Sequence, residues 1–223
     1  TYREQVEVKK YGSPGNWITV KSYPGETAVL DGTDPVTGWT QAASNDSYLT
    51  IQGTVNPNYN NIYWMRVKAS NFPTNLSDTV FFEDRIMARI ASDPDQSVGF
   101  GEDTLEMRNV GEGSNGQASY LIDTTLSQND DYWNGAIVRV FLYNHNASVV
   151  SRNVADYIKD EHKIVFDSDT SANLYYTESK KDRYRFVNHP HILDSADEFY
   201  VSAIENVEGT DYRRVYYWPK NVA

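Results

Sequence analysis

Closely spaced carboxylates are the first feature of this sequence that could do chemistry, because two of them can share general acid and general base work across one bond. Local pairs occur at Asp93/Asp95, Glu102/Asp103, Asp130/Asp131, Asp167/Asp169 and Asp197/Glu198. Adjacent carboxylates in polar turns are usually solvated, so these pairs by themselves identify no catalytic residue. The catalytic residues are therefore left unknown.

One of these pairs, Asp167 and Asp169, has the setting of an ion site. Both residues follow a strand expected over residues 163–166, so their carboxylates would project from one strand-end loop and present oxygen ligands to Ca²⁺. Residues 170–173 supply neither the glycine nor the closing glutamate of an EF-hand loop. Asp167 and Asp169 are kept as candidate metal ligands, and Ca²⁺ is the cofactor they would hold.

The histidines predict no metal site. On a strand, His189 and His191 would point to one face, but a zinc site needs three protein ligands and no further His or Cys lies nearby in the sequence. We expect this pair, together with His145 and His162, to be surface or hydrogen-bonding residues. The chain has no cysteine, which excludes disulfides, thiol nucleophiles and thiolate zinc sites.

Aromatic clusters are the remaining chemical feature. Exposed Tyr and Trp rings can stack on the apolar faces of sugars while neighbouring Asn side chains bond to hydroxyl groups. The candidates for carbohydrate binding are Tyr132, Trp133 and Asn134 in one cluster, and Tyr217 and Trp218 in another. The alternative is that these rings belong to the core, as most tryptophans of β-proteins do.

Charge and hydropathy limit the kinds of partner that the chain is expected to bind. A formal net charge of -11 argues against binding nucleic acid or anionic membranes, and no run of about 18 apolar residues predicts membrane insertion. Asn45, Asn75 and Asn146 each begin an Asn-x-Ser sequon, which is either a chance match or a glycosylation acceptor. With the acidic, cysteine-free composition, these sequons lead us to expect an extracellular or cell-surface protein.

Strands joined by polar turns must position these residues. Between Gln5 and Gly53, short apolar alternations with Gly and Pro between them recur roughly every ten to twelve residues. This spacing fits either antiparallel hairpins or the faces of a β-solenoid coil. A domain boundary near Gly53 is expected, because the short apolar alternations give way there to a longer polar loop. Further strands are expected over 62–67, 120–122, 136–141, 163–166, 184–187, 199–201 and 214–218, with a hairpin over 80–89 and one short helix over 154–160.

Several segments resemble one known family. Residues 2–6, 12–20 and 23–32 resemble the N-terminal coil of right-handed parallel β-helix proteins, many of which are glycoside hydrolases, polysaccharide lyases or epimerases. Residues 80–89 and 132–136 resemble an antiparallel β-rich insertion found in some of these proteins, and 193–200 with 215–219 resemble the segment that returns their chain to the solenoid. Where the family pattern has Pro-Gly-Glu-Trp-Tyr, this chain has Ala196-Asp197-Glu198-Phe199-Tyr200.

The resemblance implies an all-β chain. Residues 1–52 would start a right-handed parallel β-helix, and residues 53–223 would form a barrel-like or sandwich-like antiparallel insertion with a return strand at the C-terminus. It also implies an extracellular carbohydrate-active protein that binds or acts on polysaccharide. The family's catalytic residues lie on rungs that would follow Ala223, so none is carried over and an enzymatic role rests on resemblance alone.

Two alternative functions stay open. One is a structural or adhesive extracellular subunit of a filament, sheath or surface layer, which would self-associate through an edge strand. The other is a non-catalytic carbohydrate-binding module, which would present stacking aromatic rings on one exposed face.

Overall fold

The computed structural model describes residues 9, 11–19, 21–26, 33–95, 107–111, 114, 119–142, 148–168, 174 and 182–220. The chain divides into two compact units, Thr1–Thr37 and Gly38–Ala223. The described part of the first unit contains an isolated antiparallel bridge between Ser13 and Asn16, closed by a turn in which Gly15 has a φ of 85°. The aromatic side chains of Tyr11, Trp17 and Tyr23 are exposed in this unit.

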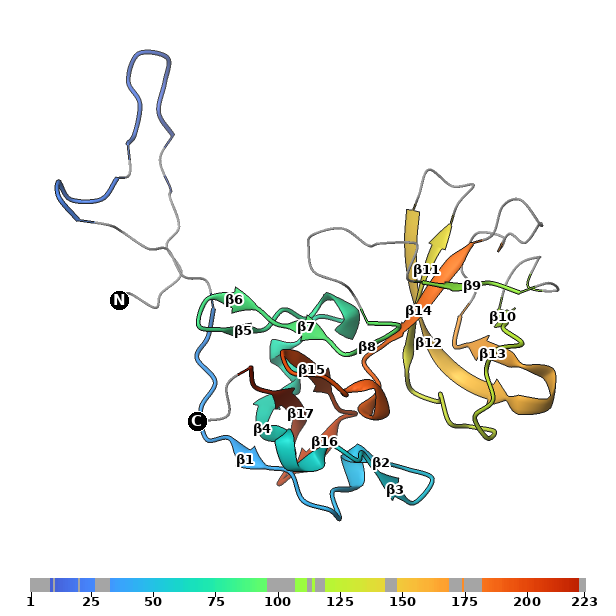
Figure 1. The fold of residues 1–223 in the computed structure, drawn as a ribbon. Coiled ribbons are helices and arrows are strands. Elements are labelled where there is room, and N and C mark those ends of the chain that lie inside the picture. Colours follow the sequence, from blue (N-terminus) through green and yellow to red (C-terminus); the bar gives the residue numbers. More distant parts are fainter. Residues whose placement is uncertain are drawn as a thin grey trace. The chain divides into compact units, whose positions relative to one another are not determined.

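The second unit is built on two sheets (Figure 1). The first has six strands, and its pairs are antiparallel except for the parallel pair of β7 with β15. Its order is β1 (Thr40–Gln41), β4 (Tyr63–Lys68), β17 (Thr210–Trp218), β15 (Glu198–Val201) and β7 (Arg89–Ile90), with β16 (Glu205–Val207) added to β17.

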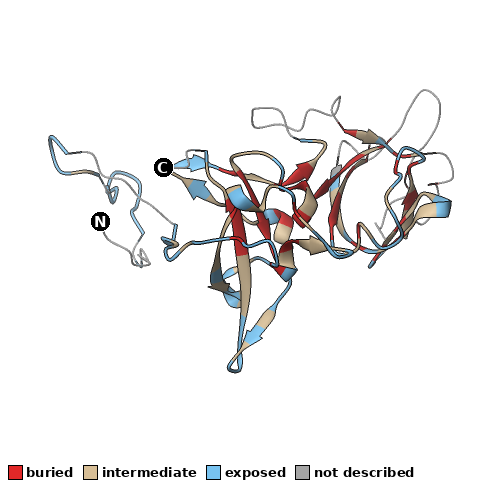
Figure 2. Cartoon of the chain, turned by 60° about the horizontal axis from the view of Figure 1, so that its bottom comes forward, coloured by how far each residue is buried: buried red, intermediate tan, exposed pale blue. Residues whose placement is uncertain are grey.

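The second sheet has seven strands, all paired antiparallel. It curls around its own core in Figures 1 and 2. Its order is β10 (Tyr120–Ile122), β13 (Lys163–Phe166), β12 (Ser148–Ile158), β11 (Ile137–Leu142), β14 (Arg183–Val187) and β8 (Ser92–Asp93), with β9 (Arg108–Asn109) also pairing with β14.

Short elements lie between the strands of the two sheets. Two hairpins are formed by β2 (Thr50–Ile51) with β3 (Thr54–Val55) and by β5 (Phe82–Glu83) with β6 (Ile86–Met87). The helices are single 3₁₀ turns: η1 (Ser47–Leu49), η2 (Tyr59–Asn61), η3 (Ala69–Asn71), η4 (Leu76–Asp78), η5 (Lys159–Glu161) and η6 (Pro190–Ile192). Within the described ranges, no helix has the length and apolar character that crossing a bilayer requires.

Aromatic residues fill the core. Strands of both sheets bury side chains in one large cluster, visible as the red segments of Figure 2, and the indole of Trp133 stacks on the ring of Phe186 with centroids 3.8 Å apart. A smaller cluster lies on the other face of the first sheet and includes Phe199 and Tyr217. All four residues of β15 are buried, because this strand has a cluster on each face.

The structure confirms the all-β class, the antiparallel sheets and the strands expected beyond Gly53. The hairpin expected over 80–89 is present, with Asp84 and Arg85 at its turn, both at positive φ. The predicted helix over 154–160 is wrong, because residues 154–158 belong to β12. The register of β12 against β13 shifts between Val154 and Asp156, and this bulge gives the buried Val154 and Tyr157 a spacing of three, which resembles a helix in the sequence.

The parallel β-helix itself stays a prediction. Half of the residues that carry the resemblance within 1–32 lie outside the described ranges, and the described residues 11–19 form no strand. The domain boundary expected near Gly53 does not coincide with the division of the compact units, which falls between Thr37 and Gly38. Gly53, at a φ of 80°, lies in the turn between β2 and β3.

Candidate functional site

A cleft of about 720 Å³ opens within the second unit, where the ends of strands from both sheets meet η1 and the residues before η4. Serine, threonine and asparagine form the largest group of its lining residues. The cleft is lined by Ser47, Tyr48, Thr50, Ile51, Thr74, Asn75, Leu76, Asn134, Gly135, Ile137, Ser151, Arg152, Asn153, Asp167, Ser168, Asn188, His189, Pro190, Tyr200, Val201, Ser202, Ala203 and Arg213. Its volume falls in the range of small-molecule sites, about 300–1,000 Å³.

The buried Asn188 forms one wall of the cleft by joining the two sheets. It follows β14 and has a φ of 57°, a left-handed conformation that asparagine tolerates better than most residues. Its Nδ2 donates to the carbonyl of Val201 at 3.0 Å, and its Oδ1 accepts from the amide of Val201 at 2.8 Å. These two hydrogen bonds hold the end of β14 beside the end of β15.

The histidines after β14 are hydrogen-bonding residues, as expected from the sequence. His189 is buried, its Nε2 lies 3.0 Å from the carbonyl oxygen of Tyr132, and its Nδ1 accepts from the amide of His191. His191 contacts the carbonyl oxygen of Thr54 through Nε2 and the hydroxyl of Tyr132 through Nδ1. Burial, with a smaller effect from His191, lowers the pKa of His189 to about 3, so this ring stays neutral in the floor of the cleft.

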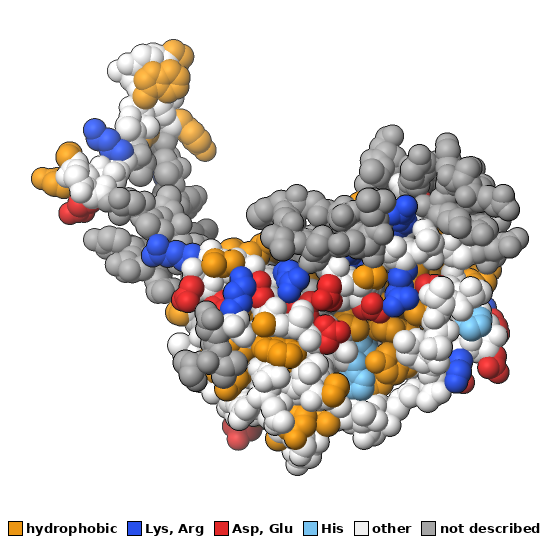
Figure 3. All heavy atoms as spheres, viewed as in Figure 1, with side chains coloured by type: hydrophobic (Ala, Val, Ile, Leu, Met, Phe, Trp, Pro, Cys, Tyr) orange, Lys and Arg blue, Asp and Glu red, His pale blue; other side chains and the backbone are white. Residues whose placement is uncertain are grey.

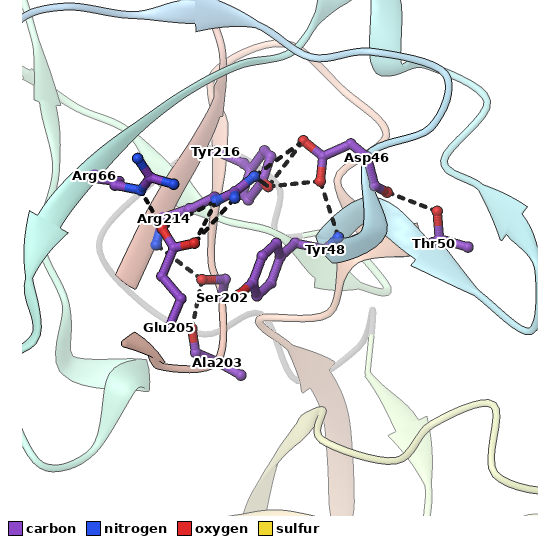
Figure 4. A network of polar contacts seen from close by, with 9 residues as sticks. All are labelled: Asp46, Tyr48, Thr50, Arg66, Ser202, Ala203, Glu205, Arg214 and Tyr216. Atoms are coloured by element: carbon purple, nitrogen blue, oxygen red, sulfur yellow. Dashed lines mark hydrogen bonds and ion pairs between the residues drawn. The ribbon is translucent and has the colours of Figure 1, made fainter. Parts of the chain in front are cut away.

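A charged network holds η1, and with it Tyr48, at the cleft (Figure 4). The guanidinium of Arg214 on β17 donates to the carboxylate of Glu205, with its Nη2 at 3.0 Å from Oε2. Its Nη1 lies 3.8 Å from Asp46, and the hydroxyl of Tyr216 donates to Asp46 at 2.9 Å. Asp46 in turn accepts the amide of Tyr48 and so caps η1.

Aromatic rings complete this Arg214 network. The guanidinium carbon lies 4.3 Å from the ring centroid of Trp64 and 4.5 Å from that of Tyr48, so the cation is sandwiched between two rings. Arg66 adds a second bond to Glu205, at 2.6 Å. Residues 46–50 are therefore fixed to the first sheet by charge, hydrogen bonds and ring contacts together.

The charges of the cleft come from Arg152, Arg213 and Asp167. Asp167 is exposed, accepts a hydrogen bond from Asn153 at 2.7 Å and is contacted by the hydroxyl of Ser168 at 3.2 Å. Arg213 donates to the carbonyl of Ser202 at 2.8 Å, and burial lowers its pKa. Because His189 is neutral, cationic side chains outnumber anionic ones here, although the chain as a whole is acidic.

The sequence-predicted calcium pair is only partly placed. Asp167 lines the cleft after β13, whereas Asp169 lies outside the described residues. The pair therefore stays a prediction.

The residues of the two predicted aromatic clusters differ in how far they are buried. Trp133 is 2% exposed and stacked on Phe186, so its indole offers no face to a sugar, and the structure corrects its assignment as a stacking platform. Tyr217 is likewise buried, at 4% exposure, with its hydroxyl donating to Glu83 at 2.8 Å, so its ring is also a core ring rather than a surface platform. Trp218 is half-buried and packs against the core.

The other members of the first aromatic cluster lie nearer the surface. Tyr132 is half-buried and contacts both histidines after β14. Asn134 lines the cleft and donates to Asp131 at 2.9 Å, while its Oδ1 has no hydrogen-bond partner among the described residues. Asn134 is thus the carbohydrate-binding candidate that the structure places in the cleft.

The sequons are placed at two of three positions. Asn45 is exposed in a turn before η1. Asn75 is exposed on the cleft, where its Oδ1 accepts from the amide of Ser77 at 3.1 Å and caps η4. Asn146 lies outside the described residues. Glycosylation at any of them stays a prediction.

Sequence reasoning missed most of the cleft. Arg152 with Asn153, Asn188, and Arg213 come from three separate stretches of chain, and no spacing within one stretch joins them. The one available signal was local: Asn188 directly follows the strand Arg183–Val187, and asparagine is among the residues that tolerate the positive φ found there.

Comparisons with known proteins give little. No family profile matches the chain, and no curated protein matches it. A solved structure named "Glycoside hydrolase" is similar with a TM-score of 0.43 and 14% sequence identity over 72% of this chain. The chain spans 27% of that longer structure. A similarity this weak assigns neither fold nor activity.

Proposed function

We propose that this chain binds a glycan in the cleft between its two sheets. The observation that carries the proposal is the lining of the cleft, in which hydroxyl and amide side chains surround a volume of about 720 Å³. A sugar presents a hydroxyl group on nearly every carbon, and such a ligand needs many donors and acceptors at short range. Asparagine, serine and threonine provide both, and arginine adds several donors in one plane.

Tyr48, which is half-buried, adds apolar ring surface to this polar lining. The position of Tyr48 is fixed by the Arg214 network, so little conformational entropy remains to be lost when a ligand binds beside it. A pre-organised ring next to amide side chains is the arrangement that sugar recognition requires.

The wider proposal follows the family resemblance. The chain would belong to an extracellular, carbohydrate-active protein of the right-handed β-helix kind, with residues 53–223 as its inserted β-rich domain. We assign no catalytic residue to this chain, and an enzymatic role for it rests on the resemblance alone. The structural-subunit alternative needs a long free strand edge, whereas the edge strands β1 and β7 of the first sheet have two residues each.

Glycan binding is tested by titrating the full chain with a panel of soluble polysaccharides, including pectin, alginate and neutral glucans, by isothermal calorimetry and affinity gels. We expect Asn153→Ala to weaken binding of the best glycan roughly five- to tenfold, because the exposed amide of Asn153 lines the cleft and one hydrogen bond contributes about 1 kcal/mol. Asn71→Ala is the matched control, since Asn71 is exposed on η3 and outside the cleft.

Two results would contradict glycan binding in the cleft. One is the absence of any bound glycan across the panel. The other is a glycan whose affinity is unchanged in both Asn153→Ala and Arg213→Met, which would place the ligand elsewhere on the surface.

A further inference from the structure

Three carboxylates from two separate parts of the chain meet at one point outside the cleft. Asp95 follows β8, Asp194 follows η6, and Glu198 begins β15. Oxygen atoms of the three side chains all lie within 4.8 Å of one another. In Figure 3, acidic side chains gather on the surface where Figure 1 places β7 and β8. We call these three residues the acidic cluster.

Glu198 is the buried member of the acidic cluster. Its side chain has no exposed surface, and its Oε2 accepts from the amides of Asp194 at 3.3 Å and Ser195 at 3.2 Å. Its Oε1 has no hydrogen-bond partner among the described residues. Buried polar oxygens are almost always paired, and a carboxylate oxygen left without a partner is especially costly. An oxygen in this position calls for a ligand.

The positive charge near the acidic cluster does not balance it. Arg89 is the neighbouring cation, and its Nη2 donates to the carbonyl of Ala196 at 3.2 Å and contacts the hydroxyl of Ser195 at 3.5 Å. Arg108 is paired at 2.8 Å with Asp93, a further carboxylate beside the cluster. Among the residues that the structure describes, Arg89 is the cation that opposes the raised pKa of both Asp194 and Glu198.

Burial and the neighbouring negative charges raise the pKa of two of these carboxyl groups. Burial, followed by the charges of Asp95 and Asp194, raises the pKa of Glu198 to about 8. Burial and the charges of Asp95 and Asp93 raise the pKa of Asp194 to about 6. Arg89 opposes both shifts without cancelling them. A bound cation would offset the repulsion that adds to the effect of burial.

We propose that Asp95, Asp194 and Glu198 form a binding site for a divalent cation, with Ca²⁺ as the preferred ion. All three ligands are carboxylates, which are hard oxygen donors and suit Ca²⁺ or Mg²⁺ rather than zinc or copper. Two of the three residues are exposed, so water can complete the six to eight oxygens that Ca²⁺ takes. The hydroxyl of Ser195, 3.5 Å from the Oδ2 of Asp95, is a further oxygen within reach.

The site differs from the calcium pair predicted from the sequence. Asp167 lies on the cleft beside Asn153, and within the part of the chain that the structure describes it belongs to no group of three ligating side chains. The acidic cluster would instead connect the start of β15 to the end of β8, so the ion would join the two sheets. Its role would be to hold the sheets together rather than to contact the ligand of the cleft.

The test is a calorimetric titration of the full chain, freed of metal with EDTA, with CaCl₂ and separately with MgCl₂, together with thermal unfolding in each ion. We expect Ca²⁺ to bind with one site per chain and to raise Tm, and Mg²⁺ to bind at least tenfold more weakly. Asp95→Asn, at an exposed position, should lower the Ca²⁺ affinity at least tenfold without unfolding the chain.

Two further variants make the test specific. Asp160→Asn removes one exposed carboxylate on η5 and should leave Ca²⁺ binding unchanged. Asp167→Asn should also leave it unchanged. The proposal is overturned if the native chain shows neither heat nor a Tm shift with Ca²⁺ at millimolar concentration. It is equally overturned if binding survives both Asp95→Asn and Asp194→Asn, or is abolished by Asp167→Asn alone.

Discussion

Two glutamates at the starts of successive strands, Glu198 of β15 and Glu205 of β16, have opposite surroundings. The side chain of Glu205 is 9% exposed and accepts hydrogen bonds from Arg214 and Arg66. Glu198 has no exposed surface and faces two further carboxylates, with backbone amides on one of its oxygens. Burial alone would raise the pKa of either group. At Glu205 the two arginines outweigh burial and lower the pKa, whereas at Glu198 burial and its acidic neighbours raise it.

The difference separates a structural network from a ligand site. Around Glu205 the chain supplies its own cations, so the charges are balanced once the protein has folded. Around Glu198 the negative charges exceed the neighbouring positive one, so the balance has to come from a proton or from a bound cation. A charge-balanced network stabilises the fold by itself, and an unbalanced one makes stability depend on the solution.

The largest effect is expected from removing the central cation of the balanced network. Arg214→Met should lower the free energy of unfolding by about 3–5 kcal/mol, because the buried Asp46 would lose its neighbouring guanidinium and the largely buried Glu205 would be left with the more exposed Arg66. Urea denaturation of the native chain and the variant measures this difference. A loss below about 1 kcal/mol would mean that the Arg214 network contributes little to the fold.

A smaller effect is expected from pH at the unbalanced cluster. In EDTA, the folded state should hold a proton on Glu198 up to pH about 8, whereas the unfolded chain releases it near its ordinary pKa of 4.5. The folded state then binds more protons between these values, so the free energy of unfolding should fall as pH rises from 4.5 to about 8.

Glu198→Gln is the control for this pH dependence, since it keeps the shape of the side chain and removes the titration. Its unfolding free energy should change less between pH 5 and 8 than that of the native chain. Equal slopes in the two proteins would show that Glu198 titrates normally. Glu205 acts in the opposite direction, because its lowered pKa stabilises the fold above its unfolded pKa and this contribution is lost as pH falls.

The smallest effect is expected at the rim of the balanced network. Arg66 shares the Oε1 of Glu205 with Arg214, but its side chain is 43% exposed. Arg66→Ala should therefore cost only about 0.5 kcal/mol, as exposed ion pairs do, in the same urea experiment. A cost comparable with that of Arg214→Met would mean that exposure does not separate the two arginines.

Local patterns predicted the strands well where one face is buried and the register is regular. Residues 163–166 alternate between half-buried and buried side chains, and β13 has the bounds expected from the sequence. The pattern failed at β12, because the extra residue of its bulge breaks the two-residue period. The family resemblance was informative at Asp197, which has a φ of 73° where the family pattern has glycine.

The candidate sites were less predictable than the strands. Trp133 and Asn134 are neighbours in sequence, yet one is buried in the core and the other lines the cleft. Side chains of successive residues point in different directions, so a cluster in the sequence is not a cluster in space. Asp93/Asp95 and Asp197/Glu198 were recognised as carboxylate pairs, but each was recognised only with its own sequence neighbour.

The sequence by itself determined the all-β class, the positions of most strands beyond Gly53 and the absence of cysteine chemistry, because these depend on local alternation and composition. Only the tertiary structure decided which polar residues act together. It brings Asp95 to Asp194 and Glu198, and Arg214 to Asp46, across long stretches of chain. Strand order and register set these contacts, and both depend on packing between distant segments, which no local pattern encodes.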